Sequence, residues 1–337
     1  MIPAGRISRL RTGVPLLLLA FLSLSCGSGG TDFAGGGTGG TGISTGTITG
    51  FGSVVVNGVH FRTDGSVAQG FTTKKLYNGA DHSGRADKDV FAVGMVVTLR
   101  HGAGDSNASE IEYRDNLQGP VAARKVSGTD NVIEVLGQTV VVDDAAIFSS
   151  LKGNDVVSVS GFADTAGRIR AASVLPVSPS IKEFKACGFA SGWSPSDAVF
   201  RLGPLPDGSG AGVTVSYDPA AVTGLPGWLA NGMYVEVVTT DREPVGGIIT
   251  AIRIGKVTAR TEFPDGTPVV LEGLVTTPWN GSGDDLSFAV EGKRVRRDAG
   301  TEWVGGTAND LRRADSKVQV QGTESGGALT AAKIVFR

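Results

Sequence analysis

Few residues in this sequence combine the types and spacing that chemistry requires. The three histidines, His60, His82 and His101, are accompanied by several aspartates. A metal site or a Ser-His-Asp triad would need several of these side chains to converge. The spacings HxxxH, HExxH and CxxC, which mark metal and redox sites, do not occur. We therefore predict no catalytic residue, no cofactor and no metal site, with an enzyme whose site is unrecognised as an alternative.

Aromatic side chains make a better case for binding. Trp193 and Trp279 follow an expected first strand, at nearly the position that Phe51 holds earlier in the chain. Rings at such positions can stack on a flat ligand such as a sugar, or they can close the end of a hydrophobic core. We keep both interpretations and take Phe51, Trp193 and Trp279 as candidate ligand-binding residues. For Trp228 and Trp303, near expected helical segments, we expect a core role.

The first residues predict export and anchoring. A basic segment with three arginines precedes the apolar run VPLLLLAFL at 14–22. This run is too short to cross a bilayer, which takes roughly 20 residues in a helix. Ser25-Cys26 follows, and the stretch resembles a bacterial lipoprotein signal, which is cut before a cysteine that then carries lipid. We expect a signal peptide at 1–25 and lipid attachment at Cys26, with ordinary secretion as the alternative.

Composition narrows the class of partner. The chain has 337 residues and a formal net charge of −2, which argues against nucleic acid because phosphate backbones are bound by clustered Lys and Arg. The 51 glycines favour short strands and tight turns. Residues 26–42 are rich in Gly and Thr and predict a flexible tether. With Cys26 lipidated, Cys187 has no disulfide partner, and we expect it to be a small apolar side chain.

From residue 43 onward the chain repeats. Four units begin at Gly46, Gly119, Gly188 and Gly273, each followed by a short β-type segment. Each unit has a hairpin pattern with Gly at the turn. An aspartate then follows the next strand, where we expect it to cap a turn or helix rather than to bind a ligand; these aspartates are Asp64, Asp143, Asp218 and Asp298. The predicted domains are 43–115, 116–181, 182–270 and 271–337, which we call repeats 1 to 4.

Two further landmarks complete each repeat. A short segment at helical spacing, such as AAIFSSL at 145–151, ends at a residue that tolerates the left-handed conformation; these residues are Gly94, Asn154, Gly232 and Asp315. An alanine then stands three residues before a branched residue, at Ala108, Ala171, Ala251 and Ala331. Because an offset of three changes faces in a strand, this spacing marks either two surfaces or a bulge.

The order of elements is three strands, a short helix or turn, and two strands. This order matches the OB-fold, a five-stranded Greek-key barrel with its helix between strands three and four. We predict an all-β protein of four tandem small five-stranded β-barrels, with a row of open β-sandwiches as the alternative.

Three stretches of repeat 1 carry a family resemblance. GTITGFGSVVVNGVHF, VGMVVTLRHG and ASEIEYRD resemble the bacterial domain of unknown function 5666, which occurs in tandem copies in exported lipoproteins. Repeats 2 and 4 fit the same skeleton, and repeat 3 departs from it through a longer hairpin at 202–213. The resemblance implies extracytoplasmic β-domains and carries over no catalytic residue.

The sequence favours a non-catalytic, lipid-anchored protein of the cell envelope that binds a glycan or an envelope protein. In a Gram-negative cell, Gly27 after the lipidated cysteine, in place of the retention residue Asp, resembles lipoproteins sorted to the outer membrane. The main alternative is a structural spacer in which the four repeats set a distance.

Overall fold

The computed structural model describes residues 41–65, 70–102, 106–220, 229–281 and 287–337. The predicted signal peptide at 1–25, Cys26 and most of the tether therefore lie outside the described residues. Over these described residues the fold is all-β, with 54% strand and one α-helix, as the Gly-rich, strand-patterned sequence predicts. Among the described residues, no helix has the length and apolar character needed to cross a membrane.

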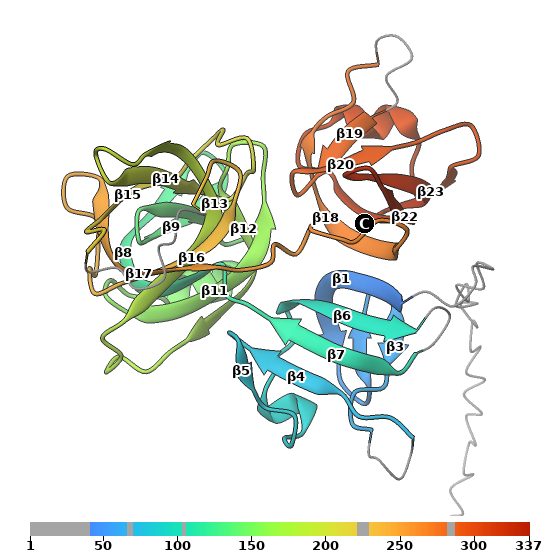
Figure 1. Ribbon diagram of the computed structural model, residues 1–337, viewed down its shortest axis with the longest axis horizontal. Helices are drawn as coiled ribbons and strands as arrows, with labels where there is room; N and C mark the ends of the chain where they lie inside the picture. Colours follow the sequence, from blue (N-terminus) through green and yellow to red (C-terminus); the bar gives the residue numbers. More distant parts are fainter. Residues whose placement is uncertain (1–40, 66–69, 103–105, 221–228, 282–286) are drawn as a thin grey trace, which may run out of the picture. The chain divides into compact units, whose positions relative to one another are not determined.

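Repeat 1 contains seven strands and a short 3-10 helix (Figure 1). They are β1 (Thr41–Gly50), β2 (Val54–Val56), β3 (Val59–Phe61), β4 (Lys74–Tyr77), β5 (Ala80–Asp81), η2 (Asp87–Asp89), β6 (Val96–Gly102) and β7 (Ala108–Tyr113). β6 pairs with both β1 and β7, and β4 pairs with β7 in parallel. The inner face buries a hydrophobic cluster that includes Ile48, Leu99 and Ile111.

Repeats 2 and 3 each contribute five strands. Repeat 2 has β8 (Leu117–Ser127), β9 (Asp130–Val135), β10 (Gln138–Val141), α1 (Ala145–Ser150), β11 (Val156–Ala163) and β12 (Ile169–Pro176). Repeat 3 has β13 (Phe184–Ser194), β14 (Val199–Gly203), β15 (Val213–Tyr217), β16 (Tyr234–Thr239) and β17 (Ile248–Lys256). In both repeats the third and fifth strands are parallel partners, and the fourth strand pairs with the first.

Repeat 4 follows the same order with one added strand. Its elements are β18 (Pro268–Thr277), β19 (Ser287–Val290), β20 (Lys293–Arg296), β21 (Glu302–Val304), η3 (Ala308–Arg312), β22 (Lys317–Ser325) and β23 (Ala328–Phe336). β20 and β21 both pair with β23 in parallel. The core of this repeat is aliphatic, with Leu271, Val320 and Ile334 fully buried.

The predicted helix at 145–151 is confirmed as α1. Asp144, and not the expected Asp143, caps its start, since its carboxylate accepts hydrogen bonds from the backbone N–H groups of Ala146 and Ile147 at 2.8 and 3.0 Å. Asp143 instead pairs with Arg170. Arg124 covers the other end by donating to the carbonyl oxygens of Phe148 and Leu151. Repeats 1 and 4 carry 3-10 helices at the corresponding place, and the expected segment of repeat 3 falls largely on 221–228, outside the described residues.

The left-handed positions and the alanine landmark also agree with the sequence pattern. Gly94, Asn154, Gly232 and Asp315 have φ values of 91°, 70°, 81° and 61°. The alanine spacing was compatible with either two surfaces or a bulge, and the structure has a bulge there in every repeat. The register of the last two strands shifts at Ala108, Ala171, Ala251 and Ala331.

The prediction of small separate β-barrels is wrong. The strands lie in two continuous sheets of 13 and 10 strands, because β1 pairs with β18 across repeats 1 and 4 and β8 pairs with β13 across repeats 2 and 3. One core cluster also holds buried residues of both repeats 2 and 3. The arrangement is classed as a β-solenoid of about seven turns. Backbone pairing between repeats thus joins units that the sequence predicts as separate.

Candidate functional site

The three aromatic residues predicted to bind a ligand lie in three different repeats. Phe51 occupies the turn between β1 and β2 and is 38% exposed. Trp193 lies near the end of β13, and Trp279 follows β18. Any ligand platform must therefore be built around one of them with neighbours of its own repeat.

Trp193 has the contacts of a core-closing side chain. Its indole Nε1 donates to the hydroxyl of Tyr217 at 2.9 Å, and its backbone N–H donates to Asn231 at 2.9 Å. The half-buried ring packs against the core cluster of repeats 2 and 3. A ring whose polar group already has a protein partner is suited to a structural role.

Trp279 belongs to a larger group that we call the Trp–Arg stack: Trp279, Arg297, Trp303, Arg312 and Phe336. The guanidinium carbon of Arg297 lies 4.1 Å from the ring centre of Trp279 and 5.8 Å from that of Trp303. Arg312 lies 4.7 Å from the Trp279 ring, and Trp303 stacks on Phe336 with 6.4 Å between ring centres. These are cation–π and stacking distances.

Three elements, η3, β21 and β23, and two connecting segments, after β18 and after β20, carry the residues of this stack. Trp279 is held where its backbone N–H donates to the carbonyl of Leu311 in η3, at 3.1 Å. Arg297 directly follows β20, while Trp303 lies in β21 and Phe336 in the parallel partner β23. All three rings are half-buried and pack against the core of repeat 4. The rings of the stack thus pack against the core of repeat 4 and are also partly exposed to solvent.

Arg297 is unusual within the stack because its cation is poorly compensated. Burial lowers the pKa of its guanidinium, and its buried Nε has no hydrogen-bond partner. Buried polar groups are nearly always hydrogen-bonded, so this unpartnered Nε is unusual. Among the ion pairs of the described residues, none involves Arg297 or Arg312.

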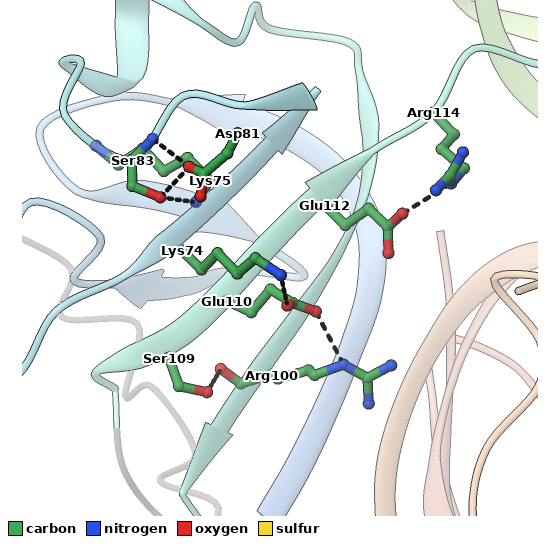
Figure 2. Close-up of polar contacts among 9 residues, drawn as sticks. All are labelled: Lys74, Lys75, Asp81, Ser83, Arg100, Ser109, Glu110, Glu112 and Arg114. Carbon is green, nitrogen blue, oxygen red and sulfur yellow. Dashed lines mark hydrogen bonds and ion pairs between the residues drawn. The ribbon is translucent and has the colours of Figure 1, made fainter. Parts of the chain in front are cut away.

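A second charged cluster lies on the sheet of repeat 1, and Figure 2 shows it. Lys74 of β4 and Arg100 of β6 both point toward Glu110 of β7, at 3.7 and 3.1 Å. Glu112, two residues along the same strand, is bonded by Arg114 at 2.7 Å. Two carboxylates on one face could act as an acid and base pair, but each already has a cation, so the cluster is a cross-strand charge ladder.

The polar loop of repeat 1 is organised around a buried lysine. Lys75 is 2% exposed, and its ammonium group bonds Asp64, Asp87 and the carbonyl of Arg85 at 2.6 to 2.9 Å. Asp87 also accepts a short hydrogen bond from Thr63. Within the part of the chain that the structure describes, no group of three His, Cys, Asp or Glu side chains could hold a metal ion. The landmark Asp64 therefore serves the packing of this loop.

A serine and histidine pair in repeat 1 was not recognised from the sequence. Residues 42–46, GISTG, have the Gly-x-Ser-x-Gly spacing of a hydrolase elbow, and Ser44 Oγ lies 3.1 Å from Nε2 of His101. The stretch lies inside strand β1, however, whereas the elbow needs a strand-to-helix turn that exposes the serine. Ser44 is 2% exposed, so the bond joins β1 to β6 inside the repeat.

The described residues hold two further reactive side chains, the thiol of Cys187 and the carboxylate of Glu291. Burial raises the pKa of the Cys187 thiol to about 12, so the thiolate that a nucleophile requires does not form near neutral pH. Burial likewise raises the pKa of Glu291 to about 7, although its carboxylate accepts hydrogen bonds from the backbone of Leu274 and Ala163. Both oxygens of this carboxylate are thus occupied by backbone.

The comparison with protein families identifies two parts of the chain. The model described as Domain of unknown function (DUF5666) matches residues 118–174 and 272–335, which fall in repeats 2 and 4. The stretches of repeat 1 that carried the resemblance lie outside these matches. No curated protein matches the sequence.

Proposed function

We propose that this chain, which contains tandem DUF5666 domains, is a non-catalytic binding module that holds a glycan at the Trp–Arg stack of repeat 4. The observation that carries the proposal is the guanidinium of Arg297 lying against both Trp279 and Trp303, rings that are only half-buried. Aromatic rings provide a flat apolar surface for the C–H face of a sugar, and the guanidinium donates hydrogen bonds to hydroxyl oxygens. Binding sites commonly combine such rings with a few placed polar groups.

Binding fits the described chemistry better than catalysis does. Two described nucleophile candidates, Ser44 and Cys187, are buried. The hydroxyl of Ser53 forms an exposed hydrogen bond of 2.9 Å with Nδ1 of His60, but among the described residues no carboxylate bonds this imidazole as the third member of a triad would. The carboxylates of the repeat 1 ladder are neutralised by neighbouring cations. A catalytic serine or cysteine needs an activating base and access to substrate. Burial leaves no such access at Ser44 or Cys187.

A glycan array probed with the mature chain tests this proposal. We expect at least one glycan class to bind, and Trp279→Ala to weaken that binding about tenfold or more while the protein stays folded by circular dichroism, since stacking contacts are worth about 1–3 kcal/mol. Phe51→Ala is the matched control, because this ring lies in a turn of another repeat and should leave binding unchanged. Absence of any glycan ligand, with capture of an envelope protein instead, would support the protein-partner alternative.

We place the module outside the cytoplasm, anchored in the cell envelope by lipid on Cys26; if the cell is Gram-negative, we place it in the outer membrane. The support is the basic and apolar N-terminal pattern followed by Ser25-Cys26-Gly27. We expect Cys26→Ser to move the protein from the membrane fraction to the soluble extracytoplasmic fraction. Unchanged membrane retention of this variant would contradict the anchor.

A structural spacer is the second candidate, and the strand pairing between repeats favours it. β1 with β18 and β8 with β13 join repeats through backbone hydrogen bonds, which suits a stiff element. A spacer requires length and tolerates loss of the Trp–Arg stack. A cellular phenotype that survives Trp279→Ala and changes when the tether at 26–42 is lengthened would favour the spacer.

A further inference from the structure

We infer that the ligand of the Trp–Arg stack is an anionic polysaccharide, one whose sugars carry carboxylate, sulfate or phosphate groups. This inference rests on the proposed function and narrows the class of glycan. It depends on how the cations and carboxylates of repeat 4 are distributed among the described residues.

The described carboxylates of repeat 4 interact with lysines or with backbone N–H groups, and not with the arginines of the stack. Those paired with lysines are Glu272 with Lys317, Glu302 with Lys333 and Glu324 with Lys293. Those that accept backbone hydrogen bonds are Glu291, Asp298, Asp310 and Asp315. In the described part of this repeat the acids thus pair with lysines and backbone, and the arginines of the stack are left without a carboxylate. Asp284 and Asp285 lie outside the described residues.

Arg297 is the centre of this uncompensated charge. Its guanidinium is partly removed from water between two tryptophan rings, and no carboxylate of the described residues forms an ion pair with it. A desolvated cation gains more from an anion than an exposed one does, since the local dielectric constant is lower. The planar fork of arginine also matches the two oxygens of a carboxylate or phosphate.

Arg312 brings a second guanidinium to the same ring. It lies over Trp279 and close to Gly281, where any Cβ would come within 2.1 Å of its Nη2 atom. Gly281 has a φ of 72°, which favours glycine. The absence of a side chain there leaves room for the guanidinium, so two cations face one aromatic platform.

Further arginines extend the positive charge beyond the stack. Arg294 and Arg296 are exposed on β20, and Arg313 is exposed after η3. None of them takes part in an ion pair between described residues. A polymer with repeated negative charges can use such neighbours through long-range attraction, whereas a neutral glycan gains nothing from them.

Binding of four probes to the mature chain tests the inference: polygalacturonate, dextran sulfate, neutral dextran and an oligothymidylate. We expect one or both anionic polysaccharides to bind with an affinity that falls as salt rises, and neutral dextran to bind at least tenfold more weakly. Arg297→Gln and Arg312→Gln should each weaken anionic binding about tenfold, the effect of losing a hydrogen bond to a charged group. Arg253→Gln is the control, because this arginine is exposed in repeat 3 and paired with Glu183.

Each other outcome has a defined meaning. Binding of neutral glycans that needs Trp279 but not Arg297 would overturn the anionic class and leave the proposed function standing. Absence of binding to every glycan would overturn both. Tighter binding of the oligothymidylate than of the polysaccharides would assign the site to nucleic acid and also overturn the inference. An Arg297→Lys variant keeps the positive charge but loses the planar fork of the guanidinium. Weaker anionic binding by this folded variant would support recognition by the fork, and unchanged binding would show that the charge alone is needed.

Discussion

Replacing Lys293 by alanine is expected to lower the free energy of unfolding of repeat 4 by about 3–5 kcal/mol, the cost of leaving one partner of a buried ion pair alone. The ammonium group of Lys293 lies 2.7 Å from Glu324, and the two side chains are 10% and 1% exposed. The second carboxylate oxygen of Glu324 is already buried without a hydrogen bond. Without the lysine, the whole carboxylate would be an uncompensated charge inside the repeat.

Hydrogen exchange of peptides from β22 and β23 in the full-length chain measures this loss locally. The double variant Lys293→Met with Glu324→Leu should recover most of the lost stability, because apolar replacement of both partners is often neutral.

Lys333→Ala is the matched control. Lys333 also pairs with a glutamate of repeat 4, Glu302, at 3.0 Å, but Glu302 is 61% exposed and water can replace the lost cation. We expect a cost of about 1 kcal/mol or less, as for surface pairs. Equal losses of stability in Lys293→Ala and Lys333→Ala would show that burial of the Lys293–Glu324 pair does not increase its contribution to stability.

The features predicted well from the sequence are those fixed over a few residues. A left-handed residue before a strand is encoded by its own type, so Gly94, Asn154, Gly232 and Asp315 could be named without knowing the fold. The helix at 145–151 has both its apolar spacing and its cap in one short stretch. Local chemistry of this kind needs no information about distant strands.

The joining of the repeats could not be predicted in the same way. β1 pairs with β18 in parallel, with Ile43 opposite Val269 and Thr45 opposite Leu271. The alternation of apolar residues in β1 is the same whether its second edge is open, closed within the repeat or covered by a distant strand. The error of separate barrels therefore came from treating each repeat as a complete folding unit.

The residues of the candidate site were likewise only partly predictable from the sequence. Trp279 could be selected as an aromatic at the end of a strand, and the bond of Trp193 to Tyr217 shows why the same pattern elsewhere is structural. Arg297 and Arg312 were missed because each looks like an ordinary charge after a strand or helix. The available signal was the pair of arginine doublets, Arg296-Arg297 and Arg312-Arg313, within one repeat.

Substitution of Gly322 by alanine is expected to destabilise repeat 4 by about 3 kcal/mol, near the upper end for overpacking. Gly322 stands opposite Ala331 at the bulge between β22 and β23. A Cβ there would lie 2.1 Å from the carbonyl oxygen of Thr330 and 2.8 Å from its carbonyl carbon. These are backbone atoms of a paired strand, so relief of the clash must separate part of the ladder.

The bulge is a shared feature, so the prediction extends to repeat 2. A Cβ on Gly161 would lie 2.2 Å from the carbonyl oxygen of Arg170, opposite Ala171 at the equivalent register shift. Gly161→Ala should therefore show a loss of similar size in hydrogen exchange of β11 and β12. Gly255→Ala is the control, because Gly255 also lies in a strand but a Cβ there meets no atom within 4 Å; its cost should be within about 0.5 kcal/mol. If alanine is tolerated equally at Gly322, Gly161 and Gly255, the close approach of the two strands at the bulge is not the reason that glycine stands there.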